Sequence, residues 1–149
     1  MFVDQVKVFI KAGNGGDGIV SFRHEKYVAY GGPFGGDGGK GGDVIFEADP
    51  GMTTLLDLRY HRRLIAQNGE KGKNKRMHGA NGDNKIVKVP LGTIVKRADD
   101  GMIVADLTEP WQQQVVAKGG RGGRGNCHFK SARNTAPKYA ESGKEGEEY

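Results

Sequence analysis

Glycine recurs at every third position in several stretches of this chain, and that spacing limits the possible folds more than any other feature. The chain has 26 glycines among 149 residues, whereas glycine usually makes up about 7% of a protein. Thirteen glycine pairs are three residues apart, against seven, six and five pairs at separations of one, two and four. A flexible low-complexity linker has no reason to prefer a separation of three. The spacing therefore favours an ordered structure.

A repeat of three residues matches the polyproline II helix, which has three residues per turn and no internal hydrogen bonds. Glycine at each third position leaves one side of such a helix bare, so another backbone can approach closely. Because buried amides are seldom left unpaired, their hydrogen bonds must then run between helices. A bundle of short polyproline II helices is expected, and a flexible glycine-rich loop is the alternative. The repeat runs through Gly32, Gly35, Gly38 and Gly41 and returns at residues 119–125.

The segments between the glycine-rich stretches are short and rich in β-branched residues, which predicts strands. Turn residues at 49–51, 81–83 and 99–101 divide these segments, as in a small sandwich or barrel. Only residues 53–60 suggest one turn of helix. The expected fold class is all-β, with a glycine-rich bundle of polyproline II helices projecting from a small β-barrel or sandwich. The predicted strands are residues 6–11, 43–48, 85–89, 93–97, 102–107 and 113–117.

The net charge of +5 is modest, but the charges are unevenly distributed. Residues 59–76 carry seven basic side chains and one acidic one, and residues 118–138 carry six basic side chains and no acidic one. Basic groups concentrated beside glycine-rich stretches indicate a polyanion partner, because neutralising phosphates releases counterions. A solvated basic surface is the alternative.

The second basic stretch contains Arg121 and Arg124, which would project from the same side of a polyproline II helix. Two guanidinium groups in register suit phosphates or stacked bases. The same string also matches disordered RNA-binding segments rich in arginine and glycine, so both interpretations stay open. RNA is favoured over DNA because no recognition helix for a major groove is visible. Further cations and possible stacking rings follow: Lys130, Arg133, Lys138, Phe129 and Tyr139.

The patterns of common catalytic and metal sites are missing from the sequence. The phosphate-binding pattern GxxxxGK[ST] does not occur, the four histidines are scattered, and the single Cys127 cannot supply a cysteine-based zinc site. No catalytic residue, metal or cofactor is therefore expected within this chain. The apolar runs are too short for a membrane span or a secretory signal, so a soluble, cytoplasmic protein is expected.

Several longer motifs, in order along the chain, resemble the amino-terminal glycine-rich domain of the bacterial Obg family of GTPases. The resemblance covers residues 1 to about 146 and implies a single domain over residues 1–149. In that family a P-loop GTPase domain follows, which binds GTP, magnesium and the alarmone ppGpp. The chain thus resembles an isolated domain, and the acidic residues 141–149 are expected to be a linker. The motifs are MFVDQVKVFIKAGNGGDGIVSFRHEKYV, GGPFGGDGGKGGDV, LLDLRYHRRLIAQNGEKG, VKVPLGTIV, ADL and VVAKGGRGGRGN.

The resemblance implies binding to the large ribosomal subunit and its rRNA, in ribosome assembly and in the stringent response to stress. The glycine-rich projection is expected to enter the peptidyl transferase region much as the acceptor end of a tRNA does. Twelve residues, 31–42, would span about 37 Å in polyproline II form. The full-length protein is expected to be a GTPase, with its own GTPase domain as a second partner of this chain.

The family motifs also imply which residues contact RNA and where this chain departs from the pattern. Ala29 and Tyr30 stand where the family often has proline and lysine, and His128 stands where it has arginine, which weakens one charge near neutral pH. A side chain at Gly79 or Gly92 should disturb a turn or a close approach. The residues expected to contact RNA are Arg23, Lys26, Lys75, Arg76, Arg121, Arg124, Lys130 and Arg133.

Two other functions remain open from the sequence. The chain could be a structural or protein-interaction domain that docks the GTPase domain or a signalling partner, with its basic segments merely solvated. It could also be a nucleotide-using enzyme, which would require that these 149 residues bind GTP.

Overall fold

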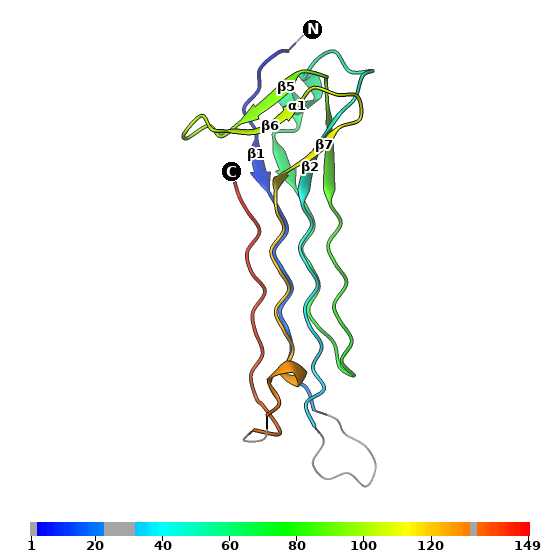
Figure 1. Ribbon diagram of the computed structural model, residues 1–149, viewed down its shortest axis with the longest axis vertical. Coiled ribbons are helices and arrows are strands. Elements are labelled where there is room, and N and C mark those ends of the chain that lie inside the picture. Colours follow the sequence, from blue (N-terminus) through cyan, green and yellow to red (C-terminus); the bar gives the residue numbers. More distant parts are fainter. Residues whose placement is uncertain (1–2, 23–31, 132–133) are drawn as a thin grey trace.

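The computed structural model describes residues 3–22, 32–131 and 134–149. Short strands form a head at one end, and long extended segments run side by side away from it (Figure 1). Six such segments are found in the described residues, and we number them one to six in chain order. Together they are called the bundle. They comprise residues 12–19, 35–43, 66–73, 77–84, 118–125 and 141–147.

The head contains almost all of the regular secondary structure. The two helices among the described residues span only five and four residues, so the all-β class expected from the sequence is confirmed. The elements are β1 (Phe9–Lys11), β2 (Val44–Ala48), α1 (Leu56–Tyr60), β3 (Arg63–Ile65), β4 (Lys85–Val89), β5 (Thr93–Lys96), β6 (Ile103–Leu107), β7 (Gln113–Ala117) and the 3₁₀ helix η1 (Asn126–Phe129).

The strands form three small sheets. β2 lies between β4, to which it is parallel, and β7, to which it is antiparallel. β1 pairs with β3 in parallel, and β5 pairs with β6 as an antiparallel hairpin. Within the described residues these pairings do not join into a closed barrel. The strand expected at residues 6–11 is limited to Phe9–Lys11, because the chain before it runs beside α1, where the Leu55 amide donates to the Val3 carbonyl at 2.8 Å.

The core of the head comes from the alternation of side chains along its strands. In β2, Val44, Phe46 and Ala48 are buried, while the two residues between them are partly exposed. Leu58 of α1 is also buried and packs into the same core. Burial of each large aliphatic side chain contributes roughly 1.5–3 kcal/mol, which stabilises the base from which the bundle projects.

Hydrogen bonds between segments recur at every third residue of the bundle. Segment one donates to segment two from Gly13 to Gly42, from Gly16 to Gly39 and from Ile19 to Gly36. Segment two in turn donates to segment three, with the Gly42, Gly39 and Gly36 amides bonded to the carbonyls of Gln67, Glu70 and Lys73 at 2.8–2.9 Å. Each segment therefore satisfies its backbone through its neighbours, as buried amides require.

The number of glycines per three residues differs between segments one and two and the hairpin formed by segments three and four. Segments one and two each bond to four other segments and carry glycine at two of every three positions over much of their length. Segments three and four lie at the edge and carry one glycine per triplet, at Gly69, Gly72, Gly79 and Gly82. Segments one and two thus have two sides without side chains, where neighbouring backbones can approach, and segments three and four have one such side.

Backbone carbonyls occupy the space that side chains would need. A Cβ added to Gly38 would overlap the carbonyl of Gly16, and one added to Gly41 would overlap that of Gly13. A Cβ on Gly35 would meet the Ile19 carbonyl, and one on Gly79 would meet the Glu70 carbonyl. These four glycines are therefore sites of close backbone approach.

Gly32 and Gly92 differ from the bundle glycines. At Gly32 the nearest atom of the described residues to an added Cβ is the Lys130 Nζ at 4.0 Å, so this member of the predicted repeat has no close backbone neighbour within the described part of the chain. Gly92 has φ +83° and open space around it, so it serves the turn between β4 and β5 through its left-handed conformation.

Asparagine and aspartate side chains in the bundle accept hydrogen bonds from backbone amides that are not bonded to a carbonyl. The Asn68 Oδ1 accepts from the Asn14 amide at 2.8 Å, and the Asp43 Oδ1 accepts from the Gly119 amide at 2.7 Å. Equivalent bonds join Lys40 to Asn81, Asp43 to Asn84, Gly125 to Asp37, Gly143 to Asp17 and Gly146 to Asn14. The polar residues between the glycines therefore complete the same network.

The acidic end of the chain, expected to be a linker, is hydrogen-bonded into the bundle as segment six. The amides of Glu141, Lys144 and Glu147 donate to segment five. The same three residues accept bonds from segment one at 2.8–3.0 Å. Segment six therefore lies beside both the first and fifth segments, at the outer edge of the bundle (Figure 1).

Replacement of Gly38 by alanine is expected to destabilise the bundle by about 1–3 kcal/mol or to prevent folding, because the methyl group would overlap a carbonyl that cannot move alone. The matched change Gly32→Ala should be nearly neutral, since no atom of the described residues lies closer than 4.0 Å to an added Cβ there. Urea unfolding followed by circular dichroism measures both. Equal stabilities of the two variants would contradict the packing described here.

Asp43 gives the stability of the bundle a dependence on pH. Burial alone would raise the pKa of this carboxyl, but hydrogen bonds from Lys40 and the Gly119 amide lower it below 3.8. A carboxyl with a lowered pKa in the folded state stabilises that state at pH values above 3.8, and the contribution is lost as pH falls through the folded-state pKa. The free energy of unfolding of Asp43→Asn should therefore approach that of the native sequence on acidification. A difference that stays constant with pH would contradict this role.

Candidate nucleic-acid interface

The turn between segments three and four presents two cations at the far end of the edge hairpin. Lys75 and Arg76 have φ angles of 61° and 56°, a left-handed conformation that is unusual for residues other than glycine. The Arg76 amide donates to the Phe34 carbonyl at 2.9 Å, which fixes the turn against segment two. Both side chains are exposed, and neither forms a hydrogen bond or ion pair with any described residue.

Lys130 adds a third cation near the same end of the bundle, directly after η1. Its side chain is exposed and likewise has no ion-pair partner among the described residues. Three further residues that the sequence indicated for RNA contact, Arg23, Lys26 and Arg133, lie outside the described residues.

A buried asparagine organises this end of the bundle. Asn126 is fully buried; its Oδ1 accepts from the Gly35 amide at 2.8 Å, and its Nδ2 donates to the carbonyls of Ser21 and Pro137 at 2.9 and 3.0 Å. The side chain thereby joins parts of the chain that are up to 116 residues apart, from Ser21 to Pro137. Sequence reasoning missed it, because one asparagine beside a glycine run carries no sign of such distant partners.

A groove of about 770 Å³ runs along the side of the bundle, and both Arg121 and Arg124 line it. Arg124 forms an ion pair with Glu141 at 2.9 Å. This contact raises the pKa of Arg124 and lowers that of Glu141. Arg121 is exposed and forms no ion pair within the described part of the chain. The two arginines thus share a face, as their spacing predicted, but only Arg121 has an unengaged guanidinium.

Asp37 places an acidic group in the same groove. Its carboxylate accepts from the Gly125 amide and from His128 Nε2, both at 2.8 Å, and lies 3.6 Å from His78 Nδ1. The carboxylate is therefore used for structure. Within the described ranges no group of three or more His, Cys, Asp or Glu side chains is arranged to hold a metal ion.

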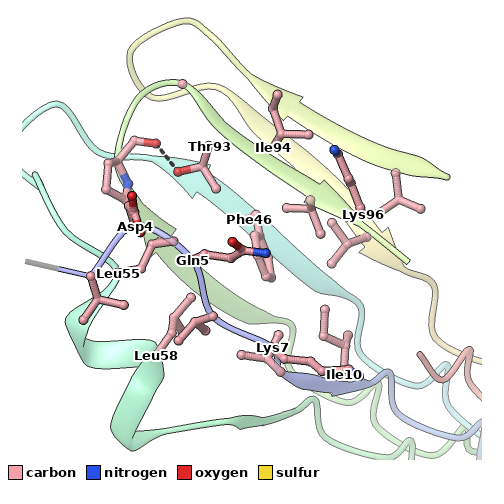
Figure 2. A pocket seen from close by; sticks show the side chains of 18 of the residues that line it. Asp4, Gln5, Lys7, Ile10, Phe46, Leu55, Leu58, Thr93, Ile94 and Lys96 are labelled. Carbon is pink, nitrogen blue, oxygen red and sulfur yellow. Dashed lines mark hydrogen bonds between the residues drawn. The ribbon is translucent and has the colours of Figure 1, made fainter. Parts of the chain in front are cut away.

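The head carries a second hollow, a groove of about 1010 Å³ between residues 3–8, α1 and the β5–β6 hairpin (Figure 2). Leu55, Leu58 and Phe46 contribute its apolar surface, and Lys7 and Lys96 contribute its charge. Asp4 is the one carboxylate among the described residues that line it, and that lining includes no histidine or cysteine.

The features of a P-loop site for GTP and magnesium are not found in the sequence motifs or among the described residues. The sequence has no GxxxxGK[ST] loop to cradle phosphates, and the described residues supply no acidic cluster for the metal.

Among the helices of the described chain, none is long and apolar enough to span a membrane.

Loss of the free arginine should weaken polyanion binding more than loss of the paired one. Arg121→Gln is expected to lower the affinity for single-stranded RNA by about 3- to 10-fold at low salt, because it removes an uncompensated charge. The double variant Arg124→Gln/Glu141→Gln keeps the net charge and should bind nearly as the native sequence does. Fluorescence anisotropy measures both. A larger loss in the double variant would show that Arg124 is the contacting group.

The sequence matches the family model described as GTP1/OBG over residues 3–149. Similar proteins named GTPase Obg include those of Geobacillus kaustophilus, 60% identical over 148 residues, and Thermoanaerobacter sp., 55% identical over 148 residues. That of Leuconostoc mesenteroides is 59% identical over 146 residues. The alignments cover 98–99% of this chain but only 33–35% of these three proteins, so the chain spans about a third of the length of the curated relatives that it matches.

Proposed function

This chain belongs to the GTP1/OBG family and corresponds to the amino-terminal part of Obg GTPases, and from this we propose that it binds the large ribosomal subunit through rRNA. In this proposal GTP binding and hydrolysis, with magnesium, belong to the part of the relatives beyond the matched third. The chain itself is a binding module that acts in ribosome assembly and in the stress response, in the cytoplasm.

The observation that carries this proposal is the position of unpaired cations at the far end of the bundle. Lys75, Arg76 and Lys130 are exposed there without partners among the described residues. Lys40 and Arg97, by contrast, are paired with Asp43 and Asp100. Free cations gain the most from phosphates, because no internal ion pair has to be broken first.

The shape of the bundle supports entry into a narrow RNA cavity. We interpret its segments as polyproline II helices, because their hydrogen bonds repeat every three residues and Gly125 has φ −71° and ψ 165°. In that geometry twelve residues span about 37 Å. Since glycine adds no side-chain bulk, such a bundle is thin for its length. Insertion into the peptidyl transferase region is the form of binding that this shape suits.

The position of Tyr149 favours a second candidate function, docking of the GTPase part of the protein against the head. The Tyr149 amide donates to the Ile10 carbonyl at 2.8 Å, and its ring lies 4.6 Å from the Arg97 guanidinium. Tyr149 also lines the head groove. The residues that follow in the relatives would therefore begin beside that groove.

The double variant Lys75→Gln/Arg76→Gln should bind isolated large subunits more weakly and with less dependence on salt. Each lost phosphate contact reduces the slope of log K against log salt by about 0.7–0.9, so two should reduce it by about 1.4–1.8. Sedimentation through sucrose at several salt concentrations measures this slope.

The matched control is Lys88→Gln in β4 of the head, which should leave the slope unchanged. Salt-independent binding of the native chain, or no binding, would contradict the ribosomal function. Binding to a separately produced GTPase domain without binding to subunits would favour the docking function instead.

A further inference from the structure

Two aromatic rings lie against each other where segment five ends and the chain turns toward segment six. The ring centroids of Phe129 and Tyr139 are 4.8 Å apart with an interplanar angle of 43°. The Arg124 guanidinium lies 5.5 Å from the Phe129 ring. Tyr139 is 53% exposed, so the outer member of this group presents much of its ring to solvent.

The buried Asn126 network holds both rings in place. Phe129 ends η1, the short helix that begins at Asn126. On the other side, the Pro137 carbonyl accepts from Asn126 Nδ2 at 3.0 Å, and the Glu141 amide donates to the Arg124 carbonyl at 2.9 Å. Tyr139 lies between these two anchored positions. A ring fixed in this way loses little entropy when a flat ligand stacks on it.

The charges around Tyr139 match a nucleic acid better than an apolar peptide. Lys130 and Lys138 are exposed and have no ion-pair partner among the described residues. The nearby carboxylates are already engaged, Glu141 by Arg124 and Asp37 by His128. An exposed ring flanked by free cations is the arrangement by which proteins bind single-stranded nucleic acid: bases stack on the ring and phosphates contact the cations.

We propose that Tyr139 is a stacking site for an unpaired RNA base, with Lys130 and Lys138 contacting the flanking phosphates. This inference rests on the proposed RNA-binding function and adds a base contact to its phosphate contacts. Stacking uses the flat π face, which all four bases have, so the site accepts any base. The stacking energy at Tyr139 can be measured separately from the phosphate contacts at Lys75 and Arg76, because an RNA strand without bases can make the phosphate contacts but cannot stack.

Two labelled RNA strands of equal length and charge test the proposal, a twelve-nucleotide oligouridine and the same sugar-phosphate strand without bases. The native chain should bind oligouridine about 10-fold more tightly than the abasic strand in fluorescence anisotropy. Tyr139→Phe should keep this preference, since the ring remains. Tyr139→Leu should abolish it while leaving the affinity for the abasic strand unchanged, and thermal unfolding should confirm that both variants fold.

Equal affinity of the native chain for the two strands would overturn the stacking site while leaving the charge-based function intact. A preference that persists in Tyr139→Leu would place the base contact elsewhere and would also overturn it. Failure of the native chain to bind either strand or large subunits at low salt would instead contradict the proposed function itself.

Discussion

Amide-to-carbonyl hydrogen bonds between neighbouring segments, repeated at every third residue, are the interaction on which the rest of the structure depends. Most of them form where two backbones come closer than side chains normally allow, and in these bonds at least one of the two partners is glycine. Side-chain burial stabilises the head, whereas the bundle has little apolar surface to bury. Its order comes instead from a nearly complete pairing of polar backbone groups, to which the Asn and Asp side chains contribute.

Much of this architecture could be predicted from the sequence, because the three-residue period is a local signal. It identified Gly35, Gly38 and Gly41 as sites of close approach, and β-branched runs located β2 and β4–β7 to within one residue at each end. At Gly32 the period continues, but no backbone of the described residues lies within 4 Å of an added Cβ. Spacing along the chain reports the geometry of one segment and not the presence of a partner.

The sequence could not predict which segments lie together. The parallel pairs β1–β3 and β2–β4 continue contacts made in the bundle, so they follow from the order of the segments rather than from any turn motif. The same applies to the candidate interface. Composition located the basic stretches, but only the structure separates Arg121, which has no ion pair with any described residue, from Arg124, which forms one with Glu141. The acidic residues 141–149 are predicted to be a linker from the sequence, because a charged, glycine-containing segment looks like a linker when its hydrogen-bond partners are unknown.

The place of segment six has a consequence for biosynthesis. Gly15 and Gly18 donate to the carbonyls of Lys144 and Glu141, so their amides find these partners only after residues more than 120 positions later have been translated. Contacts between such distant positions carry a high loop-closure cost and slow the search for the native state. The nascent chain therefore emerges with exposed glycine-rich stretches that cannot assemble fully until residue 147 has left the exit tunnel.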